Sequence, residues 1–279
     1  MSKVRIWLLM AVLSIILVLI GRALFGGHGA VIFFLIALGM NFFTYYQSDK
    51  IAIAMTRSRP LGRDEAPEIY EIVEHLSMRA GLPTPRIYLT PSPQPNAFAT
   101  GRNPQHAAVA VTDGLLRLLN RTEIEGVLAH ELAHVKNRDT LVGTIAAALA
   151  GAVTMIASIF QWGLILGAGR DDEEGGGALG GLVLAILAPL AAMLVQMAIS
   201  RAGEFNADAT GARIAGRTDG LTSALEKLES AARRVPMQVN PAASHLFIVN
   251  PLSGESVMKL FSTHPPVAER VKRLRAMSF

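Results

Sequence analysis

The sequence contains no cysteine. Disulfide frameworks and thiolate metal sites are therefore excluded, although this absence does not assign the protein to a redox compartment. Charge is also missing from four apolar stretches of the 279-residue chain, at 6–20, 30–46, 141–169 and 178–200. Hydrophobic residues make up 51% of the sequence, slightly more than is usual for a soluble domain, and the excess lies in these four runs.

The lengths of the four runs predict membrane-spanning helices. A helix needs about 20 apolar residues to cross the hydrocarbon core. The two later runs exceed this length, and the two earlier ones require tilt or snorkelling of a flanking residue. A cleaved signal peptide is the alternative for 6–20, but no small-x-small cleavage site follows and a second apolar run comes at once. A buried hairpin of a soluble protein is the alternative for the later pair, and their length disfavours it.

Lysine and arginine predict the orientation of these spans. All but two of the 26 basic residues, Arg22 and Arg170, precede the first run, separate the second from the third, or follow the fourth. The positive-inside rule places these basic segments, and with them both termini, in the cytoplasm. The acidic glycine-rich turn at 170–177 is then outside. The formal charge of +4 is interpreted as this topology signal, so no nucleic-acid partner is expected.

The chain divides into four predicted segments: 1–46 with two spans, 47–140 in the cytoplasm, 141–200 as a transmembrane hairpin, and 201–279 in the cytoplasm. In the first cytoplasmic segment, Asp64 and Pro67 open a helix that stops at Gly81. A short strand at 86–89 follows, then a β-hairpin formed by 97–100 and 107–112. Thr122 opens the next helix, and Glu125 completes a capping box with it.

The Thr122 helix contains the sequence His130-Glu131-Leu132-Ala133-His134. Histidines at i and i+4 share a helix face, so their imidazoles can converge on one Zn²⁺ ion at about 2.0–2.1 Å. Glu131 lies beside them as a candidate general base, able to take a proton from water and pass it to the leaving amine. A five-residue pattern also arises by chance on charged helices, but small and aliphatic neighbours favour the metal site here.

A catalytic zinc site needs three protein ligands, and Glu204 can supply the third. Glu204 and Asp208 are spaced i and i+4, so they also share one helix face. Asp208 can then accept a hydrogen bond from the outer nitrogen of a ligating histidine. The alternative is a solvated amphipathic helix whose acids pair with Arg201 or Arg213.

These motifs, with Asn96-Ala97-Phe98-Ala99 and Thr263-His264-Pro265-Pro266, resemble the HtpX-type membrane zinc metalloproteases, relatives of the eukaryotic CAAX prenyl proteases. The resemblance covers essentially the whole chain. It implies a mostly α membrane protein with four transmembrane helices and a cytoplasmic gluzincin-like metallopeptidase domain that contains a small β-hairpin or sheet. It also implies one Zn²⁺ per chain and ATP-independent endopeptidase activity in the quality control of damaged membrane proteins in the cell (inner or plasma) membrane.

The resemblance gives three further residues or segments two interpretations each. His264 matches the family's histidine near the metal, a candidate to stabilise the oxyanion, or it caps the last helix. Arg270 joins His264 at the site, or belongs to a solvated basic face with Lys272, Arg273 and Arg275. The segment 96–99 is an edge strand that binds extended substrate, or an ordinary short strand.

Three rival functions are an intramembrane protease, a non-catalytic adaptor with a relic site, and CAAX processing. Polar residues around the motif are unsuited to the depth of an intramembrane protease. A relic site would lack Glu131 or a ligand, and this sequence lacks neither. CAAX processing stays open as an alternative, although four spans are few for an enzyme with a prenyl chamber. No proline or glycine lies between His134 and Leu141, and Glu204 follows Ser200 by four residues. We therefore expect helices that run directly into the spans, with zinc within about 10 Å of the hydrocarbon boundary.

Overall fold

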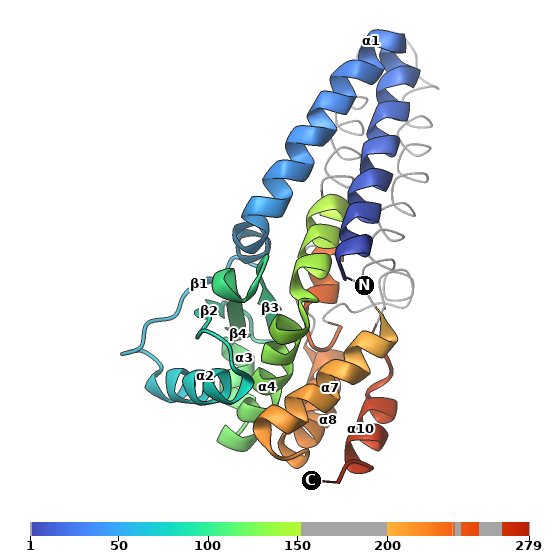
Figure 1. The fold of residues 1–279 in the computed structure, drawn as a ribbon. Coiled ribbons are helices and arrows are strands. Elements are labelled where there is room, and N and C mark those ends of the chain that lie inside the picture. The colour runs from blue at the N-terminus through green and yellow to red at the C-terminus, as the bar shows by residue number, and fades with distance from the viewer. Residues whose placement is uncertain (1, 152–199, 236, 238–240, 251–263, 279) are drawn as a thin grey trace.

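The structure is a computed structural model that describes residues 2–151, 200–235, 237, 241–250 and 264–278. The described part is mostly helical and contains one small sheet (Figure 1). The elements in chain order are α1 (Ser2–Met55), β1 (Arg59–Pro60), α2 (Pro67–Ala80), β2 (Arg86–Thr90), β3 (Ala97–Thr100), η1 (Pro104–His106), β4 (Ala108–Thr112), α3 (Asp113–Leu118), α4 (Arg121–Asn137), the helix Thr140–Gly151, α7 (Arg201–Ala215), α8 (Asp219–Arg234), η2 (Pro241–Leu246) and α10 (Val267–Arg275).

The element α1 is a long helical hairpin that projects from the rest of the protein (Figure 1). The chain turns at Gly26, where φ is 66° and ψ is −149°, a conformation that is open to glycine. The two arms approach closely, because a Cβ on Gly21 would lie 2.5 Å from the carbonyl oxygen of Gly29. The first arm also packs against the helix Thr140–Gly151 in one apolar cluster that includes Leu9, Leu13, Leu17, Ile145 and Leu149.

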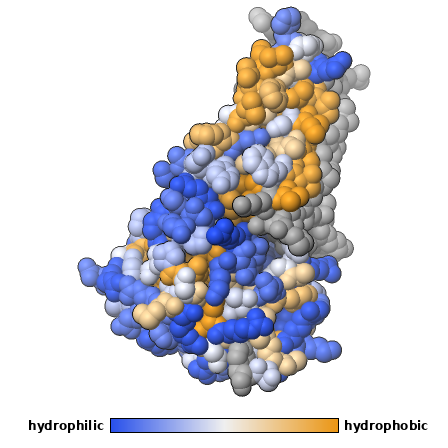
Figure 2. Space-filling model, viewed as in Figure 1, coloured by the Kyte–Doolittle hydropathy of each residue, from blue (hydrophilic) through white to orange (hydrophobic). Residues whose placement is uncertain are grey.

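The hairpin exposes an apolar surface. By length and composition, Gly26–Met55 is the one helix in the described ranges that could cross a membrane; Ile6–Arg22 and Thr140–Gly151 are shorter. Among the described residues, the large exposed apolar side chains lie on α1, apart from Met78 and Leu118. Figure 2 shows this surface in orange above a hydrophilic base. Such an extended apolar face requires a non-aqueous or protein partner.

The four predicted spans are described to different extents. The runs at 6–20 and 30–46 are helical, and the second helix continues past the predicted boundary at 46 to Met55. Gln47 departs from helical geometry directly after that boundary, with φ −108° and ψ 15°. The structure describes the third run only as far as Gly151 and the fourth only at Ser200. The rest of the third and fourth predicted spans lies outside the described residues, so four spans stay a prediction.

The sheet has the strand order β1-β2-β4-β3. The predicted hairpin is confirmed, since β3 and β4 pair antiparallel with Ala97 opposite Val111. The strand predicted at 86–89 is β2, which runs parallel to β4. All five residues of β4 are buried, and β3 forms one edge of the sheet. The predicted helix that stops at Gly81 is α2.

The capping box of α4 differs from the prediction. The side chain of Asn120 accepts a hydrogen bond from the Glu123 backbone N–H, and Glu123 accepts one from the Asn120 backbone N–H. The box predicted at Thr122 and Glu125 is therefore wrong by two residues. Buried Glu123 also accepts a hydrogen bond from Lys227 of α8. This contact favours the capping box of Asn120 and Glu123 over that of Thr122 and Glu125.

The helices that carry the predicted site are not continuous with the predicted spans. Arg138 ends α4 in the left-handed conformation, with φ 59°, and a separate helix begins at Thr140. Ser200 is extended, with φ −128° and ψ 121°, and caps the N-terminus of α7. The expectation of helices that run straight into the spans is therefore wrong. Arg138 ends α4 and Ser200 begins α7, so neither boundary needs a glycine or a proline.

Candidate metal centre

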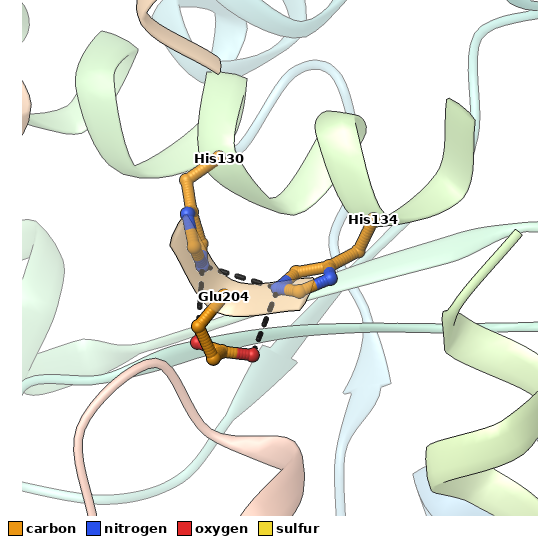
Figure 3. A group of neighbouring side chains, drawn as sticks. All are labelled: His130, His134 and Glu204. Atoms are coloured by element: carbon orange, nitrogen blue, oxygen red, sulfur yellow. Dashed lines mark hydrogen bonds and ion pairs between the residues drawn. The ribbon is translucent and has the colours of Figure 1, made fainter. Parts of the chain in front are cut away.

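Three predicted ligands converge between α4 and α7 (Figure 3). The Nε2 atoms of His130 and His134 lie 3.2 Å apart, and the Glu204 carboxylate lies 3.9 Å from the first and 3.5 Å from the second. Tetrahedral zinc with bonds of about 2.0–2.1 Å separates its ligand atoms by about 3.4 Å. The three side chains therefore fit a zinc ion.

Close helix packing brings the ligands together. His130 and His134 lie one turn apart on α4, and Glu204 lies in the first turn of α7. The two helices meet at Gly211, where an added Cβ would lie 2.9 Å from the backbone nitrogen and Cα of His130. Only glycine allows this approach, so Gly211 sets the distance between the two halves of the site.

A buried carboxylate orients the first histidine. Asp208 Oδ1 lies 3.0 Å from His130 Nδ1 and accepts a hydrogen bond from it. This bond directs Nε2 of His130 toward the other ligands. Arg270 in turn donates to both oxygens of Asp208, from Nε at 2.9 Å and Nη2 at 2.7 Å. Arg270 is 1% exposed and also donates to the carbonyl oxygen of Ile248. It therefore supports the site and does not belong to the exposed basic face.

Burial and neighbouring charges shift the pKa values of the two histidines in opposite directions. Burial lowers the pKa of His130 to about 4, although Asp208 opposes the shift, so this imidazole is neutral as a ligand requires. Burial also disfavours protonation of His134, but Glu204, Asp139 and Glu131 outweigh it and raise its pKa to about 9. The negative potential that raises this pKa also favours a bound cation.

Glu131 lies in the same cavity as the ligands and is 2% exposed. Burial raises its pKa to about 7, with Glu204 adding to the shift and His134 and Arg270 opposing it. A carboxylate with a pKa near neutral can both accept and release a proton, as a general base must.

His264 contacts the ligand set. Its Nδ1 lies 3.0 Å from Glu204 Oε2, and its Nε2 lies 3.2 Å from the carbonyl oxygen of His245. The helix α10 starts at Val267 with Pro266 as its N-cap residue, and no side chain accepts a capping hydrogen bond from its first backbone N–H groups. The capping interpretation of His264 is therefore wrong, and its imidazole lies beside the metal ligands.

The predicted substrate edge is partly occupied. The backbone N–H of Ile248 donates to the carbonyl oxygen of Ala97, and the Asn96 side chain donates to Val249. Asn96 thus fixes a neighbouring backbone segment, a role that the sequence analysis did not assign. Only the Ala99 end of β3 reaches the cavity.

The site opens into a cavity of about 400 Å³. Its walls include the three ligands, Glu131, His264 and apolar side chains, among them Phe247 and Ile248. This volume lies within the range of small ligand sites and accommodates part of a peptide.

Comparison with known proteins decides the family. Residues 63–278 match the sequence model of peptidase family M48, and that range contains every ligand and Glu131. The chain belongs to peptidase family M48. This M48 peptidase is a metalloprotease, a hydrolase that acts on peptide bonds, and its recognition as HtpX-type from the sequence is confirmed.

Relatives of this M48 peptidase match it over 96–100% of their own lengths. A protease HtpX homolog of Pelotomaculum thermopropionicum is 69% identical over 100% of both chains. Homologs from Syntrophobacter fumaroxidans and Pyrococcus furiosus are 55% and 52% identical, over 99% of this chain each and 99% and 96% of their own. The crystal structure of S. mikatae Ste24p shares 19% identity, with a TM-score of 0.48 over 94% of this chain and 61% of that one.

Proposed function

We propose that this M48 peptidase is a zinc-dependent endopeptidase anchored in the cell (inner or plasma) membrane, where it cleaves misfolded or damaged membrane proteins on the cytoplasmic side. The convergence of His130, His134 and Glu204 at 3.2–3.9 Å carries the proposal, because two imidazoles and one carboxylate are a ligand set of catalytic zinc sites.

Each residue has a distinct task. The three ligands would hold one Zn²⁺ ion, which would supply Lewis-acid chemistry toward water and the scissile carbonyl. Glu131 takes a proton from the attacking water and delivers it to the nitrogen of the leaving amine. His264, within 3.0 Å of Glu204, is placed to donate to the oxyanion once its bond to that ligand is released. Ala99, the residue of β3 that lines the cavity, would pair with extended substrate.

Membrane embedding is supported by the apolar hairpin of α1 and by the four uncharged runs. The distribution of basic residues supports four spans with the catalytic part and both termini in the cytoplasm. The helix Thr140–Gly151, which packs against α1, begins six residues after His134. A substrate that emerges from the bilayer would therefore meet the cavity near the membrane surface.

Proteolysis by purified protein tests this function. Protein in detergent is incubated, without ATP, with casein as an unfolded soluble substrate and with a destabilised membrane protein. We expect internal cleavage of both that a zinc chelator stops and added Zn²⁺ restores. Cleavage that survives complete removal of metal would contradict the zinc assignment, and removal of single terminal residues would contradict endopeptidase activity.

A further inference from the structure

A second cavity, of about 730 Å³, lies where the hairpin α1 meets the segment between β3 and η1 and the end of α4. It is separate from the metal centre and shares no lining residue with it. The residues that line it are Ile6, Trp7, Met10, Asn41, Phe42, Tyr45, Tyr46, Arg102, Asn103, Arg138 and Leu141.

The lining is apolar on the hairpin side and cationic on the domain side. Ile6, Met10 and Phe42 come from the two arms of α1, whereas Arg102 and Arg138 come from the domain. None of the residues that line it is acidic. The cavity therefore combines an apolar wall with two positive charges at one end.

The two guanidinium groups have no carboxylate partner within the described parts of the chain. Arg102 donates to the backbone carbonyl oxygen of Tyr46, lies 5.6 Å from the centre of its ring and contacts His106. Arg138 is exposed at the left-handed end of α4. In contrast, other arginines of the domain, such as Arg59 and Arg86, pair with carboxylates. The charge at this end of the cavity is thus available to an anion.

Aromatic residues place this cavity at the level of lipid headgroups. Trp7 lies near the start of the first arm of α1, Tyr45 and Tyr46 lie directly before the non-helical Gln47 of the second, and all three line the cavity. Tryptophan and tyrosine are enriched at the membrane–water interface. In a bilayer, Arg102 and Arg138 would then lie among phosphates, and the apolar wall among acyl chains.

We propose that this cavity binds one anionic phospholipid. Arg102 and Arg138 hold its phosphate and charged headgroup, and Met10 and Phe42 contact the first part of its acyl chains. Basic pockets beside transmembrane helices suit anionic lipid because charge and apolar contact act together. The inference rests on the membrane embedding proposed above, but not on proteolytic activity.

Lipid titration of the full-length, zinc-loaded protein in detergent tests the site. Native mass spectrometry would measure binding of phosphatidylglycerol, phosphatidylcholine with the same acyl chains, and glycerol phosphate without chains. We expect phosphatidylglycerol to bind best, and the double variant Arg102→Gln/Arg138→Gln to bind it about 30-fold more weakly, roughly fivefold for each arginine. The control is the double variant Arg117→Gln/Arg213→Gln, of two exposed arginines that have no carboxylate partner among the described residues, and it should bind as the wild type does.

Equal binding of phosphatidylcholine by the wild type would overturn the proposal without any variant. Undiminished phosphatidylglycerol binding by the Arg102/Arg138 variant would overturn it as well, and tight binding of glycerol phosphate would show a site for a free anion. The inactive variant Glu131→Gln should bind lipid normally, so a failed protease assay leaves this test intact. Protein that does not partition into membranes would instead refute the embedding on which the site depends.

Discussion

Arg270 binds Asp208 through two parallel hydrogen bonds, and Asp208 holds the outer nitrogen of the ligand His130 at 3.0 Å. Such a chain fixes the orientation of the imidazole and raises its basicity as a ligand. We therefore propose that Arg270 and Asp208 are positioning residues that would act on a bound metal through His130.

Asp208→Asn should weaken zinc binding by about 10- to 100-fold, because an amide cannot supply the charge that supports His130. Competition with a chromophoric chelator measures this affinity. Asp219→Asn is the matched control, since Asp219 pairs with Arg217 on the surface, and it should leave the affinity unchanged. Equal affinity of the Asp208 variant and the wild type would refute the positioning role.

Gly211→Ala should separate α7 from α4 and reduce zinc binding, since its Cβ would lie 2.9 Å from the backbone of His130. Overpacking of this kind costs about 1–3 kcal/mol, whereas alanine gains roughly 1 kcal/mol over glycine in a helix, so we expect a net loss of up to about 2 kcal/mol. The control is Gly203→Ala on the same helix, where the nearest atom is 3.6 Å away. The thermal unfolding temperature and the zinc content should fall for Gly211→Ala but not for Gly203→Ala. Equal values for the two variants would show that Gly211 does not set the helix spacing.

Glu123→Gln should destabilise the fold by about 2 kcal/mol at pH 7, because Glu123 is a buried acceptor for Lys227, Ser223 and the backbone of Asn120. Burial alone would raise the pKa of Glu123, but these donors outweigh it and lower the pKa below 4.5. The stabilisation is thus present above the unfolded pKa and is lost as the pH falls through the lower folded pKa.

Urea unfolding of the detergent-solubilised protein between pH 7 and pH 3 measures this loss. The difference between wild type and variant should shrink below about pH 4.5. The control is Glu125→Gln, which removes the carboxylate of the capping box that the sequence predicted. It should change the free energy of unfolding little. A larger loss for Glu125→Gln than for Glu123→Gln would contradict the observed register.

Reporter fusions test the predicted topology. A reporter fused after Phe279 and one inserted near residue 63 should both report a cytoplasmic location, because basic residues flank those segments. One inserted at Gly175, in the acidic turn, should report an external location. A cytoplasmic signal at Gly175 would contradict the positive-inside argument and the four-span count.

Periodicity and motif spacing predicted the elements that short-range chemistry determines. The hairpin of β3 and β4, the stop of α2 at Gly81 and the convergence of His130, His134 and Glu204 all followed from the sequence. A helical i, i+4 spacing fixes relative side-chain direction before any tertiary contact is known.

Tertiary contacts decided what the sequence could not. Two capping registers compete at the start of α4, and Lys227, 104 residues away, favours Glu123. Arg138 breaks a helix in a conformation usually associated with glycine. Arg270 lies on the same face of α10 as Val267, Val271 and Leu274, and its pairing with Asp208, 62 residues away in sequence, accounts for the burial of its charge.

The most direct test compares zinc content and peptidase rate in Glu131→Gln and Glu204→Ala, purified in parallel with the wild type. Glu131→Gln should keep one zinc per chain and lose about 10²- to 10⁴-fold in rate, because the base is removed while the ligands stay. Glu204→Ala should lose both the metal and the activity. Full zinc occupancy in Glu204→Ala, or a wild-type rate in Glu131→Gln, would contradict the assignment of these two residues.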